Sequence, residues 1–236
     1  MPSLKLLSGG AAHGLVAAVT PQFAAVTGWS VDGTYGAVGT MAGKLRDGEP
    51  VDVMILTAAL IAQLVKEGLL IAGSVADIGV VETAVAVRTG DPSPPIADEQ
   101  ALRAAFLAAD AIFVPDIVSS TAGVHVAKVL RQLGILEQVE GRLKVHPNGA
   151  TAMRELAASS ASRPIGCTQT TEIVITPGLK LGSVLPASCA LATVYTAAVT
   201  ARLSDATVAK ALINILVARD QRAARARAGF LETSNP

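Results

Sequence analysis

Short apolar runs alternate along this chain with longer segments whose apolar residues recur at helical spacing. The strand-like segments are residues 4–7, 29–35, 51–56, 78–88, 111–114, 164–167, 174–181 and 189–199. The segments with helical spacing are residues 11–27, 39–47, 58–67, 98–109, 121–133 and 148–159. Such alternation of strands and helices predicts an α/β fold with mainly parallel sheets.

Glycine, proline and serine positions refine this pattern. Pro21 predicts a kink or a break within residues 11–27, because proline cannot donate the helical hydrogen bond. Gly28 suits the position just after a helix, where a left-handed backbone conformation is common. Residues 204–230 have the pattern of one long final helix, which we expect Ser204 to cap.

Composition and charge narrow the possible classes of protein. The 236 residues are 51% hydrophobic with a mean hydropathy of +0.49, which excludes a disordered chain. The 19 basic and 19 acidic residues cancel, and aromatic residues make up only 3%. We therefore expect no nucleic-acid partner, and we read the four arginines within residues 219–227 as a solvated helix end. No apolar run reaches the roughly 18–20 residues of a membrane helix, so no membrane insertion is expected.

The start of the chain and its cysteines bear on location and cofactors. Residues 1–10 lack the basic and apolar regions of a secretion signal, which predicts a cytoplasmic protein, or a periplasmic one if a signal has been removed. Cys167 and Cys189 are too few for a disulfide scaffold, and we expect Cys167 to be a small buried apolar residue. The three histidines lack metal-ligand spacing, and no phosphate-binding loop or nucleophile elbow is present. We expect no metal and no cofactor.

Four junctions between a strand and a helix are rich in small and hydroxyl-bearing residues. They are residues 8–10, 35–40, 119–122 and 148–151. Each is explained equally well by helix capping alone, but together they favour a site for a small oxyanion or carboxylate, since anions bind where helices begin beyond the ends of strands. The candidate ligand-binding residues there are Ser8, Gly9, Gly10, Tyr35, Gly39, Ser119, Ser120, Thr121 and Asn148.

The order of elements resembles a known family. Residues 4–55, which open with Leu-Lys-Leu-Leu-Ser-Gly-Gly-Ala-Ala and include Gly48-x-Pro50-x-Asp52, resemble the first lobe of type II periplasmic binding proteins. The likeness is greatest to the molybdate-binding branch, which also includes aconitate isomerase. Residues 120–134 resemble the helix of its second lobe, and residues 193–199 its return strand.

The resemblance implies two α/β lobes, each a mostly parallel sheet flanked by helices, with a ligand cleft between them. The first lobe would comprise residues 1–82 and 194–236, and the second residues 83–193. Two hinge crossings would lie near residues 82–88 and 189–195. Closure of the lobes on a small anion is the motion expected of such a fold.

The family's ligand-binding positions match this chain only in part. Its first anion-binding serine falls near Ser8, and its serine–alanine pair falls at residues 56–57, which makes Thr57 a candidate. The family's cleft tyrosine falls on Tyr195. Its second serine falls at residues 37–39, which carry no hydroxyl, so the resemblance argues against a tetrahedral molybdate site.

Other polar residues stand near the expected cleft. The candidates of the second lobe follow its short strand and are Thr168, Gln169, Thr170 and Glu172. Together with His13 and Tyr35 they could hydrogen-bond several carboxylates, and His13, Tyr35 or Glu172 could act as base or acid. The alternatives are that His13 is a surface helix residue, Glu172 a solvated loop charge and Tyr195 a core residue.

Three functions are therefore open. The first is a solute-binding protein that takes an oxyanion or a di- or tricarboxylate and, if exported, delivers it to an ABC transporter. The second is a cofactor-independent isomerase of an unsaturated carboxylate, similar to aconitate isomerase, that works by proton transfer in the same cleft. The third is a cytosolic ligand sensor. We rank anion binding first because the first two functions share it.

Overall fold

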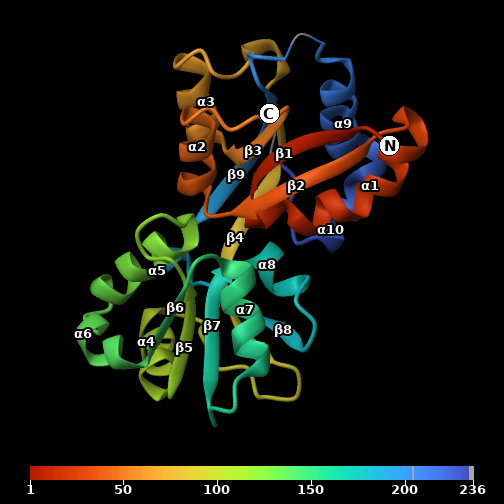
Figure 1. Cartoon of the computed structure of the whole chain (residues 1–236). Coiled ribbons are helices and arrows are strands. Elements are labelled where there is room, and N and C mark those ends of the chain that lie inside the picture. Colours follow the sequence, from red (N-terminus) through yellow and green to blue (C-terminus); the bar gives the residue numbers. More distant parts are fainter. Residues whose placement is uncertain (204, 234–236) are drawn as a thin grey trace. The chain divides into compact units, whose positions relative to one another are not determined.

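The computed structural model describes residues 1–203 and 205–233 of the chain. The chain divides into two compact units, of which unit 1 comprises Met1–Val81 and Thr193–Pro236, and unit 2 comprises Glu82–Ala192. Each unit is a sheet flanked by helices (Figure 1). The predicted α/β class is confirmed.

The sheet of unit 1 is built on three parallel strands. They are β1 (Ser3–Gly9), β2 (Ser30–Gly36) and β3 (Val53–Thr57), in the order β2-β1-β3. Strand β9 (Ala192–Val199) adds to β3 in the antiparallel direction. Strand β4 (Ala76–Arg88) begins in unit 1 and continues into unit 2.

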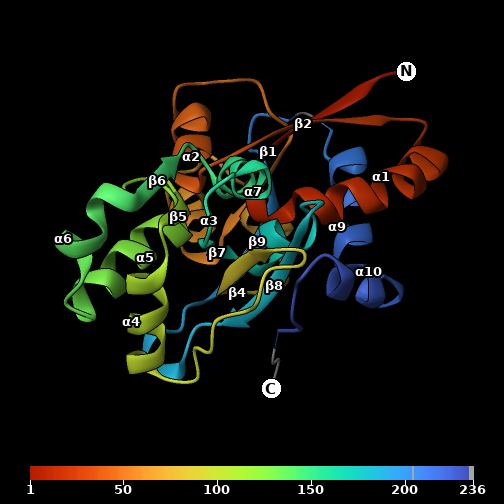
Figure 2. The ribbon, with the colours of Figure 1, turned by 90° about the horizontal axis from the view of Figure 1, so that it is seen from below.

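Helices cover both faces of this sheet. They are α1 (His13–Thr27), α2 (Val38–Arg46), α3 (Ala58–Lys66), α9 (Thr207–Val217) and α10 (Arg222–Arg227), with short 3-10 turns at η1 (Gly10–Ala12), η2 (Ala72–Ser74) and η5 (Arg219–Gln221). Figures 1 and 2 show α1 beside α9 and α10, while α2 and α3 lie on the opposite face. A single apolar core of unit 1 includes residues of each of these α-helices.

Helix α1 continues through Pro21 without the predicted break. Pro21 and Ala17, whose carbonyl loses its helical donor, are both exposed, so water can satisfy that carbonyl. On the other side of the helix Val19 and Phe23 are buried in the core and hold it in place. Gly28 follows with a left-handed backbone, φ 73°, which confirms the predicted helix end.

The single final helix predicted over residues 204–230 is wrong, because α9 and α10 are separate, and Ser204 lies outside the described residues. Arg219, Arg222 and Arg227 are exposed, as expected of a solvated helix end, but Arg225 is only 7% exposed. Its guanidinium donates hydrogen bonds to the carbonyls of Leu216 (3.0 Å) and Ala218 (2.8 Å). The charge thus adds a donor to two carbonyls at the end of α9, of which that of Ala218 also accepts the Gln221 N–H (3.1 Å).

We expect Arg225→Met to lower the free energy of unfolding by about 2 kcal/mol, because two carbonyls lose a charged donor. Urea unfolding measures the change. Arg222→Met is the matched control, since Arg222 is exposed and, like Arg225, forms an ion pair with Glu232. Equal losses in the two variants would show that the buried arginine contributes nothing particular.

The sheet of unit 2 also has a parallel centre. It consists of β5 (Ala111–Pro115), β6 (Leu143–His146) and β7 (Pro164–Gln169), with β5 between the other two. Strand β4 pairs antiparallel with β7, and β8 (Leu179–Val184) pairs antiparallel with β4.

The helices of unit 2 pack on two faces of the strands. They are α4 (Glu99–Ala108), α5 (Thr121–Gln132), α6 (Leu136–Val139), α7 (Gly149–Ala158) and α8 (Thr170–Val174), with 3-10 turns η3 (Glu140–Arg142) and η4 (Ala187–Cys189). In β5, Ile112 and Val114 join the apolar cluster under α4 and α5, whereas Ala111 and Phe113 join the one under α7 and α8. Figure 1 shows these two groups of helices on opposite sides of the strands.

The sequence pattern misses several elements of unit 2. The strand predicted over residues 174–181 is wrong in its first half, where α8 ends and a turn at Gly178 with positive φ precedes β8. Strand β6 and helices α6 and α8 were not predicted. All three are five residues long or shorter, so their patterns span too few positions to show a period.

Candidate functional site

The parallel strands of unit 1 bring four of the predicted site residues to one edge of the sheet. Ser8 on β1 pairs with Tyr35 on β2, and Thr57 on β3 pairs with Tyr195 on β9. Each parallel strand is followed directly by a helix or 3-10 turn, so the first turns of η1, α2 and α3 lie at the same edge. Backbone N–H groups without helical partners collect there.

Gly9 is required at this edge by close packing. A Cβ atom on Gly9 would lie 2.8 Å from Val38 Cγ1 and 3.0 Å from Tyr195 Cε1. Tyr195 is 1% exposed, lies in the core of unit 1 and meets Phe230 edge-on, with 6.4 Å between ring centroids. The Tyr195 ring therefore packs against the turn at Gly9. The role of Tyr195 as a ligand residue stays a prediction.

The hydroxyl groups of the unit 1 edge are used within the fold. Ser8 is fully buried, and its Oγ donates to the Gly9 carbonyl (2.8 Å). Thr57 caps α3 by accepting the Leu60 N–H (3.4 Å). Gly10 is buried in η1, whereas Gly39 is exposed in the first turn of α2. What the edge offers to a ligand is therefore mainly backbone N–H groups.

His13 and Tyr35 form a ring pair at this edge. Their ring centroids lie 4.3 Å apart, and His13 is exposed while Tyr35 is half-buried. A Cβ atom on Gly33 would lie 2.7 Å from the Tyr35 hydroxyl, so the phenol extends back along β2. Burial raises the pKa of Tyr35 to about 12, which keeps the phenol protonated at neutral pH. Tyr35 thus packs against His13, which is the exposed titratable group of the pair.

The edge of unit 2 gathers three helix starts in the same way. Ser120 caps α5 by accepting the Gly123 N–H (3.4 Å), and Asn148 caps α7 by accepting the Thr151 N–H (2.8 Å). Thr121 is half-buried as the first residue of α5. Ser120 and Asn148 therefore cap these helices, as the capping interpretation predicts. Their role as ligand residues stays a prediction.

Asp116 organises the loop that leads into α5. Its Oδ1 accepts the N–H groups of Val118 (3.0 Å) and Ser119 (2.6 Å) and the hydroxyl of Ser119 (2.8 Å). These bonds, that of the Ser119 N–H above all, lower the pKa of Asp116. The Ser119 hydroxyl is therefore committed to this turn. Sequence reasoning missed Asp116, although an Asp at the head of a loop rich in serine is typical of such turns.

Glu172 belongs to α8, and its side chain is buried against the start of α7. It is therefore not the solvated loop charge that the alternative interpretation predicts. It is 4% exposed. The Thr168 hydroxyl donates to its Oε2 at 2.6 Å, and the backbone N–H groups of Gly149, Ala150 and Gln169 also donate to the carboxyl. Burial raises the pKa of Glu172, while the four hydrogen bonds act in the opposite direction.

Gly149 is the residue that admits this carboxyl group. A Cβ atom at this position would overlap Glu172 Oε2 and the Thr168 hydroxyl oxygen. The positive end of the α7 dipole and its first N–H groups thus face a carboxyl group that belongs to the protein itself. Sequence reasoning named Glu172 but missed Gly149, because nothing local links a helix start to a side chain 23 residues later.

The remaining candidates divide between the edge and the interior. Gln169 ends β7 and Thr170 begins α8, and both are buried. His125 Nε2 lies 2.8 Å from the Cys189 carbonyl, and His146 stacks on a phenylalanine ring. Cys167 is fully buried, as predicted, and burial raises its pKa to about 12, so it is not poised as a nucleophile.

Residues 1–203 and 205–233 contain neither a metal-ligand cluster nor a membrane-spanning helix. No three His, Cys, Asp or Glu side chains there are grouped so that they could hold a metal ion. No helix in that part of the chain is long and apolar enough to cross a membrane.

Comparison with known proteins identifies the family. Residues 4–231 match the model of the bacterial extracellular solute-binding protein family, and the chain belongs to it. The aconitate isomerase of a Pseudomonas species is 26% identical over 229 residues, which cover 92% of this chain and 83% of that relative.

Solved structures share the fold. The periplasmic molybdate-binding protein of Azotobacter vinelandii superposes with a TM-score of 0.81 at 20% identity, covering 98% of this chain and 100% of that one. The sulfate-binding protein SubI of Mycobacterium tuberculosis H37Rv gives 0.77 at 22% identity, covering 99% and 88%. The predicted resemblance to the molybdate-binding branch of type II periplasmic binding proteins is thereby confirmed.

We expect Gly149→Ala to lower the free energy of unfolding by about 2–3 kcal/mol, because its methyl group displaces the Glu172 carboxyl. In a Glu172→Ala background the same substitution should cost less than in the parent, since only the Thr168 hydroxyl oxygen then remains within the overlap distance. Urea unfolding of the four proteins measures this coupling. Strictly additive losses would show that the two residues do not constrain each other.

The raised pKa of Glu172 predicts a pH dependence of stability. The folded state binds this proton more tightly than the unfolded state, so its contribution to stability falls as pH rises from the unfolded pKa towards the folded one. Glu172→Gln removes that titration. The variant should therefore gain stability relative to the parent as pH rises above roughly 4.3, the ordinary pKa of glutamate. A constant difference across urea titrations from acid to neutral pH would contradict the shift.

Proposed function

We propose that this chain binds a small anion that carries carboxylate groups, through the helix starts at the carboxyl edges of its sheets. The observation that carries the proposal is that each unit brings its helix starts to one edge of its sheet, beside residues 8–10 and His13 in unit 1 and beside residues 119–121 and 168–170 in unit 2. Backbone N–H groups at helix starts suit an anion irrespective of its shape. The molybdate- and sulfate-binding relatives share this fold, and the aconitate isomerase relative is named for a carboxylate.

The state of the hydroxyl groups favours carboxylates over a compact tetrahedral oxyanion. Ser8 donates to its neighbour's carbonyl, and residues 37–39 carry no hydroxyl. Ser119 donates to Asp116. A tetrahedral oxyanion needs several short donors around one centre, whereas a di- or tricarboxylate spreads its charge over separate groups that backbone N–H groups can receive singly.

A second candidate function is a cofactor-independent isomerase of an unsaturated carboxylate. Two observations favour it, the 26% identity to aconitate isomerase over 92% of the chain and the exposed imidazole of His13. Shifting a double bond requires a base that removes a proton from one carbon and an acid that returns one to another. His13 would do both, and Tyr35 would position its ring. The interlobe cleft, the hinges near residues 82–88 and 189–195, the transporter partner and the location stay predictions.

A ligand screen by thermal shift tests the binding proposal. It compares citrate and cis- and trans-aconitate with molybdate, tungstate, sulfate and phosphate. A ligand at about 100 times its dissociation constant adds roughly 2.7 kcal/mol to the stability of the folded state. We expect shifts from the carboxylates. Shifts from the inorganic oxyanions alone would overturn the carboxylate preference and leave an oxyanion-binding protein.

Two substitutions place the ligand. Thr170→Ala and Ser120→Ala should each weaken binding of the best ligand by about 1–3 kcal/mol, because each removes a hydrogen-bonding partner at the unit 2 edge. Calorimetric titration measures the affinity. Thr20→Ala is the matched control, since its hydroxyl donates to the Val16 carbonyl within α1, about 10 Å along the helix from His13. Unchanged affinity in both edge variants would remove these loops from the site.

The isomerase candidate has its own test. NMR of the carboxylate in the presence of the protein reports any movement of the double bond. We expect His13→Gln to abolish turnover while ligand binding persists, and Tyr35→Phe to retain most turnover because the phenol points back towards Gly33. Carboxylate binding without turnover in the parent protein would exclude the isomerase and leave the binding proposal standing.

A further inference from the structure

Unit 2 has a pocket at the edge of its sheet opposite to the candidate site. The pocket, here called the proline pocket, has a volume of about 380 Å³. The small rigid residues that line its mouth are Pro92, Pro94, Pro95, Ala105, Ala108 and Ala109. Pro164 and Ile165 also line it, and they open β7, whereas the candidate site lies where β7 ends at Gln169.

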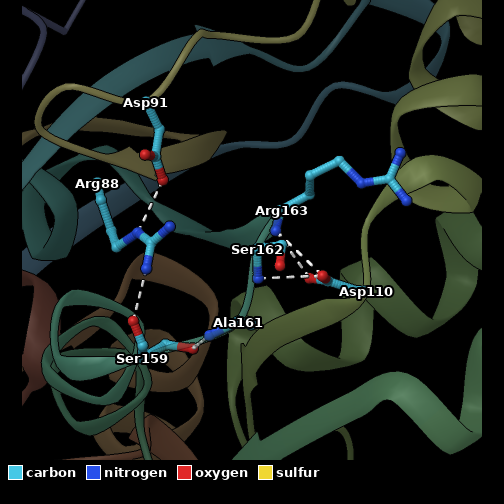
Figure 3. Close-up of polar contacts among 7 residues, drawn as sticks. All are labelled: Arg88, Asp91, Asp110, Ser159, Ala161, Ser162 and Arg163. Carbon is cyan, nitrogen blue, oxygen red and sulfur yellow. Dashed lines mark hydrogen bonds and ion pairs between the residues drawn. The ribbon is translucent and has the colours of Figure 1, made fainter.

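The loops that form the proline pocket are held in place by ion pairs and hydrogen bonds. Arg88 pairs with Asp91 (2.7 Å) and also donates to the Ser159 carbonyl (2.6 Å) after the end of α7 (Figure 3). Asp110 accepts the backbone N–H groups of Ser162 (3.1 Å) and Arg163 (3.0 Å). With proline fixing the backbone of residues 92–95, the pocket is formed before a ligand arrives.

One charge at the rim lacks a counterion. Asp91 is neutralised by Arg88, and Asp110 is engaged by backbone N–H groups. No acidic side chain within residues 1–203 and 205–233 pairs with the guanidinium of Arg163, which lines the pocket. Figure 3 shows this guanidinium extended away from the Asp110 carboxylate. An apolar pocket with an unpaired guanidinium at its rim suits an apolar molecule that ends in a carboxylate.

We propose that the proline pocket binds a small apolar monocarboxylate, aromatic or branched, separately from the anion site at the carboxyl edges. The apolar body lies against the proline and alanine residues, and the carboxylate meets Arg163. A pocket of this volume lies at the lower end of the range of small-molecule sites, which fits a single ring or a short branched chain. Such a ligand differs from a tricarboxylate, whose charges an apolar wall would have to desolvate.

The test uses phenylacetate as the probe and the uncharged phenylacetamide as its matched control. Titration of the full chain, followed by amide NMR, should give saturable shifts in the residues other than proline of the segments 89–95, 105–110 and 162–165. Phenylacetamide should bind at least about threefold more weakly, as expected for loss of one exposed ion pair. Equal affinity of the two probes would overturn the carboxylate class, and no saturable shift into the millimolar range would overturn the site.

Two variants locate the binding. Ala108→Phe fills the pocket mouth from an exposed position on α4 and should abolish the shifts. Arg163→Gln should weaken phenylacetate about threefold but leave phenylacetamide unchanged. Arg154→Gln, on the exposed face of α7, is the control and should leave both unchanged. Binding of phenylacetate that survives Ala108→Phe would place it elsewhere and overturn the proposal, whatever the outcome for citrate and aconitate at the carboxyl edges.

Discussion

The first turn of every helix leaves backbone N–H groups without helical partners, and this fold places several such turns at one edge of each sheet. The cause is the parallel arrangement of β1, β2 and β3 and of β5, β6 and β7, each followed at once by a helix or a short turn. The resulting positive edge must be balanced by a side chain, by water or by a ligand. Much of the packing at these edges follows from which group accepts hydrogen bonds from the N–H groups.

At α7 the balance is internal. The Glu172 carboxyl accepts the N–H groups of Gly149 and Ala150, and the Thr168 hydroxyl and the Gln169 N–H bring its hydrogen bonds to four. Burying a carboxylate is costly, and the raised pKa expresses that cost, but the hydrogen bonds and the helix dipole offset part of it. The arrangement constrains position 149 to glycine, so one electrostatic contact fixes a residue type on another element. At α5, by contrast, the Ser120 side chain caps the helix start.

The sequence was sufficient for much of the fold and less so for the site. The strand and helix alternation predicted the α/β class. Which residues lie at the carboxyl edge of a sheet follows from their positions at or just after the ends of parallel strands, as Ser8 and Tyr35 show in unit 1 and Asn148 in unit 2. Pro21 misled because its exposed position, which makes the missing bond cheap, depends on tertiary packing. The direction of the Tyr35 phenol and the burial of Glu172 depend on neighbours distant in sequence, which no local pattern reveals.

The surroundings of the three predicted acid–base residues differ in burial and in hydrogen bonding. The Tyr35 phenol, with a pKa of about 12, holds its proton at neutral pH and lies over Gly33. The Glu172 carboxyl is buried against the start of α7, and the hydrogen bonds that it accepts all come from the protein itself. His13 is exposed, and an imidazole ring has one nitrogen that can accept a proton and one that can donate it. An isomerase built on this edge would therefore use one residue as both base and acid, so the proton removed from one carbon would be returned in part to the other. Transfer of deuterium between the two carbons would distinguish this from two separate groups, because separate groups exchange with water independently.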